Sequence, residues 1–175
     1  AYCYDNIISY LKTGKTIPYP SELPNYIFPI FCTWLLNNKL NGCIGTFQPG
    51  RLSNVVKTYS YISAFEDERF NPITLDDLPN LTWYLSLCKD FEDFTDPNDF
   101  EIGKHGVWVV FEVNGENHSA TYIPNVPYEQ GWDYDNTWRH LIKKSGLGQT
   151  PLEELVDNIV LLKRYQSIKF GLTYD

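Results

Sequence analysis

The chain has 175 residues, and hydrophobic residues make up 43% of it and aromatic residues 16%, which excludes intrinsic disorder and fits one globular domain. A chain of this length buries about 70% of its unfolded surface, so it forms a core without disulfides or structural metals. Its 14 basic and 22 acidic side chains give a net charge of −8, which repels a phosphate backbone and excludes nucleic acid as an expected partner.

The N-terminal part of the chain predicts one helix and one hairpin. Apolar side chains at helical spacing predict a helix over residues 2–12, and Gly14 is a suitable stop. Two apolar, β-prone runs at 30–36 and 43–47 are separated by a polar stretch. We expect these two strands to pair as a hairpin.

The middle of the chain predicts a helix, a strand and a second hairpin. An apolar stripe indicates a helix near 51–65, and alternating bulk and polarity indicate a strand at 81–87. Alternating strands at 107–113 and 116–123 flank Asn114-Gly115, the strongest short signal for a two-residue type I′ turn. Such a loop pairs residues whose numbers sum to 229.

The C-terminal part predicts a helix that contains Trp138 and ends near Ser145-Gly146, followed by one or two strands within 159–173. Strands and helices alternate irregularly around a central antiparallel hairpin. This pattern predicts the α+β class, with an antiparallel-rich sheet flanked by helices.

The spacing of cysteine and histidine gives no sign of a metal or a cofactor. No CxxC or HExxH pattern occurs, and glycine-rich phosphate-loop spacing is also absent. No apolar run approaches the ~20 residues of a membrane span, and the first residues lack the basic region of a signal peptide. We therefore expect reduced thiols, an intracellular location and no contact with membranes.

Acidic side chains are concentrated in residues 66–101, where eleven of them face only Arg69 and Lys89. A block of this kind is typical of a solvated face. The alternatives are a cation site and a docking face for a basic protein.

Cys43 lies between Gly42 and Gly45 in the second predicted strand. Glycines within a strand mark a bulge or a close approach of ligand or backbone, so this thiol could be accessible and reactive. In the alternative interpretation, the glycines make room for neighbouring aromatic rings and Cys43 is a small buried hydrophobe.

Two further segments could contribute acid–base groups. His105 precedes a predicted strand and could be a general base or a turn residue with satisfied hydrogen bonds. A loop that contains Glu129 and Trp132 could be catalytic, or its Asp133 or Asp135 could cap the following helix.

These segments together resemble the AMMECR-domain family, and specifically its eukaryotic members, over residues 1–175 as a single domain. Gly42 to Phe47 is similar to the core of the family signature, Leu-Arg-Gly-Cys-Ile-Gly. One departure is that Asn41 stands where the family usually has arginine, which puts in doubt any role that needs a cation there. The match continues through Ser63-Ala64-Phe65, Asp67-Glu68-Arg69-Phe70, His105-Gly106-Val107, Ala120 to Pro124, Glu129 to Asp133 and Arg164-Tyr165.

The resemblance implies an α+β fold of two unequal lobes, with the small lobe inserted at about residues 14–40. It also implies that the signature lines a cleft between the lobes, and we expect Cys43 to be reachable there. Human relatives are linked to the nucleus, so we expect a cytoplasmic or nuclear protein. The residues expected to line the cleft or bind a ligand are Asn41, Gly42, Ile44, Gly45, Thr46, Arg69 and Trp132.

Two functions are compatible with this resemblance, because the family has no established activity. The first is a binding or regulatory module whose cleft recognises a small ligand or a protein partner. The second is an enzyme with Cys43 as nucleophile, His105 as base and Glu129 as an acid or orienting group. The genomic association of prokaryotic members with Memo-type and radical-SAM proteins favours an enzyme, whereas the absence of a visible activating feature for the thiol favours the module.

Overall fold

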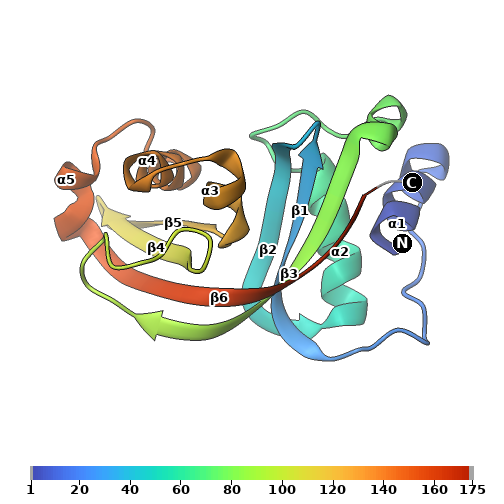
Figure 1. Cartoon of the computed structure of the whole chain (residues 1–175), viewed down its shortest axis with the longest axis horizontal. Coiled ribbons are helices and arrows are strands. Elements are labelled where there is room, and N and C mark those ends of the chain that lie inside the picture. The colour runs from blue at the N-terminus through green and yellow to red at the C-terminus, as the bar shows by residue number, and fades with distance from the viewer. Residues whose placement is uncertain (1, 174–175) are drawn as a thin grey trace. The chain divides into compact units, whose positions relative to one another are not determined.

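The computed structural model describes residues 2–173 and divides into two compact units, with boundaries between Cys88 and Lys89 and between Ser167 and Ile168 (Figure 1). Two strands, β3 (Leu81–Asp93) and β6 (Ile159–Thr173), run from one unit into the other. Each unit has its own helices and its own hairpin.

The first unit contains two helices, one 3₁₀ helix, a hairpin and the first part of β3. In chain order its elements before β3 are α1 (Tyr2–Thr13), β1 (Ile27–Leu36), β2 (Lys39–Arg51), α2 (Leu52–Phe65) and η1 (Leu75–Asn80).

Strands β1 and β2 form the predicted hairpin. Asn37 and Asn38 make its tight turn with left-handed φ values of 51° and 61°, and Thr33 lies opposite Cys43. The other edge of β1 pairs with β3 in antiparallel register. Residues 14–40 lie within the first unit, and a small lobe inserted there remains a prediction.

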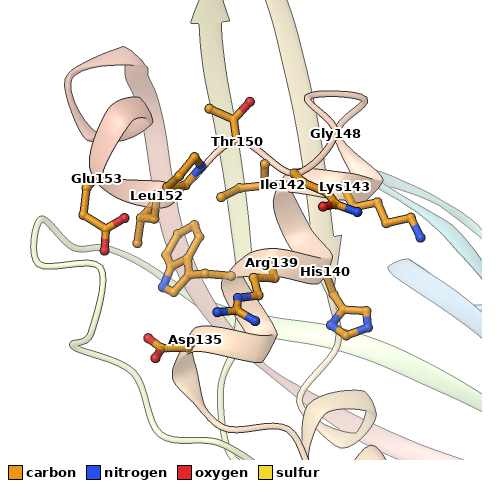
Figure 2. Close-up of a pocket in the computed structure, with 12 residues that line it drawn as sticks. Asp135, Arg139, His140, Ile142, Lys143, Gly148, Thr150, Leu152 and Glu153 are labelled. Carbon is orange, nitrogen blue, oxygen red and sulfur yellow. The ribbon is translucent and has the colours of Figure 1, made fainter.

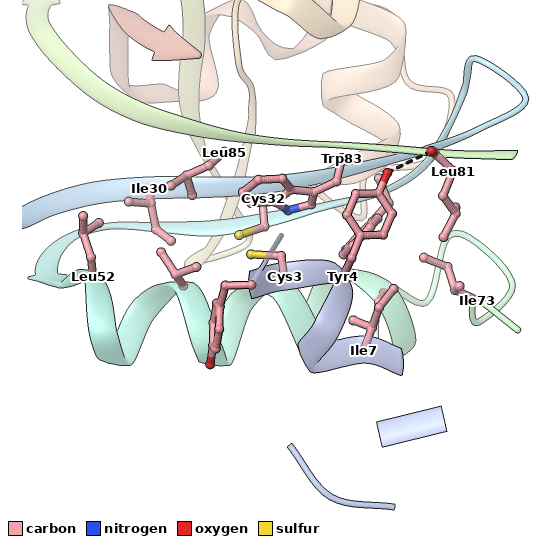
Figure 3. Packing of buried hydrophobic residues seen from close by; sticks show 14 of the residues in the cluster. Cys3, Tyr4, Ile7, Ile30, Cys32, Leu52, Ile73, Leu81, Trp83 and Leu85 are labelled. Atoms are coloured by element: carbon pink, nitrogen blue, oxygen red, sulfur yellow. Dashed lines mark hydrogen bonds between the residues drawn. The ribbon is translucent and has the colours of Figure 1, made fainter. Parts of the chain in front are cut away.

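Helices α1 and α2 cover one face of this sheet and build the core of the first unit (Figure 3). Ile7 of α1 and both Ile30 and Trp34 of β1 are completely buried. Each such side chain contributes roughly 1.5–3 kcal/mol by leaving water. The Tyr4 hydroxyl donates a hydrogen bond of 2.8 Å to the carbonyl oxygen of Leu81, which ties α1 to the start of β3.

The second unit contains the end of β3, most of β6 and the second hairpin with its helices. Its remaining elements are β4 (Gly106–Val113), β5 (Glu116–Tyr122), α3 (Asn125–Gln130), α4 (Tyr134–Lys144), α5 (Leu152–Leu155) and η2 (Val156–Asn158).

The β4–β5 hairpin has the register that the sequence predicts. Asn114 and Gly115 adopt left-handed φ values of 54° and 78°, as a type I′ turn requires. Phe111 lies opposite His118, so the predicted pairing is confirmed. Helix α4 ends at Lys144, also as predicted, and its Trp138 is buried in the core of this unit.

The six strands hydrogen-bond in the order β2-β1-β3-β6-β4-β5, and the pairs of β1 with β2 and β3, and of β4 with β5 and β6, are antiparallel. The predicted α+β class, with an antiparallel-rich sheet and flanking helices, is confirmed. Within residues 2–173, none of the helices has the length and apolar character needed to cross a bilayer.

Candidate functional site

The signature segment lies in β2, where its two glycines allow close backbone packing. A Cβ atom at position 42 would collide with the carbonyl oxygen of Ser63, near the end of α2. A Cβ atom at position 45 would collide with the carbonyl oxygen of Ile30 and with the Phe31 ring. The glycines therefore make room for a helix end, a neighbouring strand and an aromatic ring, which is the packing interpretation of this motif.

Cys43 is fully buried, contrary to the expectation that its thiol is reachable. Its cross-strand neighbour Thr33 is also fully buried and donates a hydrogen bond of 3.3 Å from its hydroxyl to the Cys43 sulfur. Sequence analysis missed Thr33, because its role depends on the register of β1 against β2.

The other three cysteines, Cys3, Cys32 and Cys88, are also free and buried. Burial raises the pKa of the Cys32 thiol well above its ordinary value and that of Cys88 to about 12. Burial likewise raises the pKa of Cys3. These thiols are protonated at neutral pH and are therefore poor nucleophiles.

The backbone of Cys43 is held by Asp67 and Arg69. The Cys43 amide donates to Asp67 Oδ2 at 3.0 Å, and Arg69 Nη2 donates to the Cys43 carbonyl oxygen at 3.1 Å. Arg69 also grips the Asp67 carboxylate, through Nε to Oδ1 at 2.8 Å and through Nη2 to Oδ2 at 2.6 Å. Both polar backbone atoms of the signature cysteine are thus bound to one ion pair.

The Asp67 carboxylate remains ionised in this environment. Burial alone would raise its pKa, but hydrogen bonds from the Arg69 side chain and the Cys43 amide favour the charged form, and the net result is a lowered pKa. Its side chain is only 4% exposed, whereas that of Arg69 is 26% exposed. Arg69 is therefore the cation that contacts the signature segment, where Asn41 supplies no charge.

The remaining signature residues make local contacts. Asn41 donates from Nδ2 to the carbonyl oxygen of Asn71 at 3.3 Å, and Thr46 Oγ1 accepts from the Gln48 amide at 3.0 Å. Ile44 is half-buried. None of these contacts identifies a ligand.

His105 lies in the second unit, just before β4, and behaves as a turn residue. Its Nδ1 accepts a hydrogen bond of 3.0 Å from the backbone amide of Glu101. Partial burial, together with the positive charges of Arg164 and Lys104, lowers the pKa of His105. The imidazole is therefore neutral at neutral pH.

The loop after α3 places its indole in an aromatic stack. Trp132 stacks on His140 with ring centroids 3.7 Å apart and an interplanar angle of 12°, and it meets Tyr122 edge-on. Asp133 caps α4 by accepting from the Asn136 amide at 2.8 Å, so the capping alternative is confirmed. Glu129 is exposed in α3.

The predicted site residues fall into two groups. Cys43 and Arg69 are in direct contact within the first unit, together with the other signature residues. The second unit holds His105, Glu129 and Trp132. The catalytic set of Cys43, His105 and Glu129 draws on both units, and its convergence remains a prediction, as does a cleft at the signature.

The second unit contains a pocket of about 530 Å³ that sequence analysis did not find (Figure 2). It lies between α4 and residues 148–153. The spacing i, i+4, i+8 of three charged residues on α4 is the signal that could have indicated a shared face. Its lining includes Asp135, Trp138, Arg139, Lys143, Leu152 and Glu153.

Part of the acidic segment 66–101 is neutralised within the second unit. Arg164 pairs with Glu92 at 2.9 Å and with Asp99 at 3.0 Å, and Lys163 pairs with Asp93 at 2.7 Å. The described residues include no cluster of three or more His, Cys, Asp or Glu side chains that could hold a metal ion.

Comparison with known proteins gives matches over nearly the whole chain. The AMMECR1 family model matches residues 1–170. The chain is 37% identical to the uncharacterized protein At2g38710 of Arabidopsis thaliana, over 99% of this chain and 83% of that protein. It is 34% identical to YOR289W of Saccharomyces cerevisiae, over 99% and 84%. The crystal structure of PH0010 from Pyrococcus horikoshii matches with a TM-score of 0.79 and 26% identity, over 99% of this chain and 89% of that one.

Proposed function

We propose that this chain, which belongs to the AMMECR1 family, acts as a binding or regulatory module and not as a thiol enzyme. The family itself has no established molecular activity. The observation that carries this proposal is the complete burial of Cys43 with its sulfur hydrogen-bonded to Thr33. A nucleophilic cysteine must present a thiolate to its substrate, and reactive cysteines lie in partly exposed, electropositive surroundings.

The surroundings of Cys43 support an architectural role for the signature. Asp67 and Arg69 occupy the Cys43 amide and carbonyl, and the flanking glycines bring β2 close to α2 and β1. These contacts fix the position of the strand without activating its thiol. His105 is neutral and hydrogen-bonded to the backbone, so its contacts also support a structural role.

We infer that the partners of this module are small ligands or proteins. A net charge of −8 disfavours contacts with nucleic acid phosphates. Four free, buried cysteines suit the reducing environment of the cytoplasm or nucleus, which is where we propose that the protein acts.

Alkylation of the native protein tests the proposal. The protein is treated with iodoacetamide near neutral pH, and each cysteine is quantified by mass spectrometry. Cys43 should label as slowly as Cys32, its buried neighbour in β1. Fast labelling of Cys43 that is lost in His105→Ala would instead support the enzyme and overturn the proposal.

A further inference from the structure

The pocket beside α4 has the charges and dimensions of a binding site for a small zwitterion. We propose that it binds a short free peptide of about three residues, with the peptide carboxylate toward Arg139 and Lys143 and its ammonium group toward Asp135 and Glu153. This inference rests on the proposed function, because it supplies the ligand class of a protein that acts by binding.

The basic side chains of the second unit differ in whether they have partners within the protein. Five of the seven have partners within the protein, and the exceptions are Arg139 and Lys143. Across the part of the chain that the structure describes, these two form no hydrogen bond or ion pair through their side chains, and both line the pocket. In such an acidic protein, two unpaired cations in one pocket point to an anionic group on the ligand. The five partnered residues are Lys89, Lys104, Lys144, Lys163 and Arg164.

The acidic side chains of the pocket define its other end. In Figure 2, Asp135 and Glu153 lie on one side and Lys143 on the other, with Arg139 between them. Neither acid forms an ion pair within the described residues. Two acids and two bases balance one another, so the pocket favours a ligand that carries both charges and has little net charge.

Helix geometry sets the length of that ligand. Asp135 and Lys143 are eight residues apart on α4, which corresponds to about 12 Å along the helix axis. An extended chain spans at most about 3.5 Å per residue, so the ends of a tripeptide are about 10 Å apart.

The pocket also offers apolar surface for the body of the ligand. Leu152 is half-buried and lines the pocket, and the largely buried Trp138 forms part of the wall. A volume of about 530 Å³ is in the range of small-molecule sites. The acids disfavour a phosphate group, whose multiple negative charges they would repel. A peptide with one charge at each terminus fits this surface better.

Calorimetric titration of the full chain with trialanine tests the assignment. Trialanine should bind, and acetylation of its amino terminus or amidation of its carboxyl terminus should each weaken binding by about tenfold or more, because each modification removes one charge-assisted contact. Absence of trialanine binding at millimolar concentration would overturn the proposal. Equal affinity for trialanine and a doubly blocked peptide would do so as well.

Substitutions at exposed positions of the pocket test its location and distinguish the two ends of the ligand. Arg139→Gln should weaken trialanine binding by about tenfold but should have little effect on the amidated peptide. Asp135→Asn should show the reverse selectivity, weakening trialanine but not the acetylated peptide. The matched control is Arg51→Gln in the first unit, an exposed cation outside the pocket. If it weakened binding as much as Arg139→Gln, the contact would be non-specific and the proposal wrong.

Failure of this inference is distinguishable from failure of the proposed function. The peptide titration reports on the pocket in the second unit, whereas the alkylation of Cys43 reports on the signature in the first. Absence of peptide binding with a protected Cys43 would refute only the ligand assignment. Rapid labelling of Cys43 that is lost in His105→Ala would refute the module, whatever the pocket binds.

Discussion

At the residue scale, the signature cysteine owes its position to side chains distant in the sequence. Asp67 binds the Cys43 amide across 24 residues, and Thr33 binds its sulfur from the neighbouring strand. A buried polar group that loses its partner has given up its hydrogen bonds to water without a replacement, which destabilises the folded state. The Asp67–Arg69 pair should therefore matter for stability as well as for position.

Asp67→Ala should lower the free energy of unfolding by about 2–3 kcal/mol, because it leaves Arg69 and the Cys43 amide without their acceptor. Asp67→Asn should cost less, since an amide oxygen can still accept from one donor. Urea denaturation measures both. Glu68→Ala is the matched control at the exposed neighbouring position and should change stability by less than about 0.5 kcal/mol.

The same carboxylate predicts a dependence of stability on pH. The pKa of Asp67 is lower in the folded protein than its ordinary value of about 3.9, so its ionised form stabilises the fold above that pH. This contribution should be lost as the pH falls below about 4 and through the lowered pKa of the folded state. Urea denaturation between about pH 3 and pH 6 should show a steeper acid loss for the wild type than for Asp67→Asn. Parallel curves would contradict this assignment.

At the element scale, β2 is in close contact with α2 and β1 because its glycines carry no side chains. Gly42 faces the rigid backbone of α2 at Ser63, whereas Gly50 faces the terminal methyl of Val55. Backbone cannot move aside as a side chain can. The two positions should therefore differ in their tolerance of one added methyl group.

Gly42→Ala should destabilise the fold by about 3 kcal/mol or more, because the new Cβ displaces a helix end. The matched Gly50→Ala should cost about 1 kcal/mol, since a Val55 rotation relieves the overlap. Thermal unfolding followed by circular dichroism compares the two. Equally small effects at both positions would show that α2 is not in tight contact with Gly42.

The elements that sequence analysis predicted correctly are those set by local patterns. Asn114-Gly115 fixed the register of β4 against β5 because a type I′ turn needs two left-handed residues. By contrast, the Thr33–Cys43 contact depends on cross-strand register, and the Asp67 contact depends on how the chain returns after α2. No local pattern encodes such contacts, so burial of the thiol could not be separated from an exposed, reactive thiol.

At the scale of the whole molecule, the chain consists of two units, each with its own hairpin and helices, and β3 and β6 continue through both. The family resemblance was predictable because its motifs span nearly the whole sequence, and the α+β class was predictable because strands and helices alternate irregularly around an antiparallel hairpin. The unit boundaries were not, because they fall within β3 and β6, where no change in composition marks them. The pocket was also not predictable, because its lining comes from two separate segments, α4 and residues 148–153.

The urea dependence of Cys43 alkylation tests most directly whether the signature thiol is part of the core. If it is, Cys43 becomes reactive only when the fold opens, so its labelling rate should rise with urea in parallel with Cys32. The free energy of opening calculated from the protection of Cys43 without urea should then equal the free energy of global unfolding. Labelling of Cys43 at a rate independent of urea, while Cys32 stays protected, would contradict the account and show an accessible thiol at the signature.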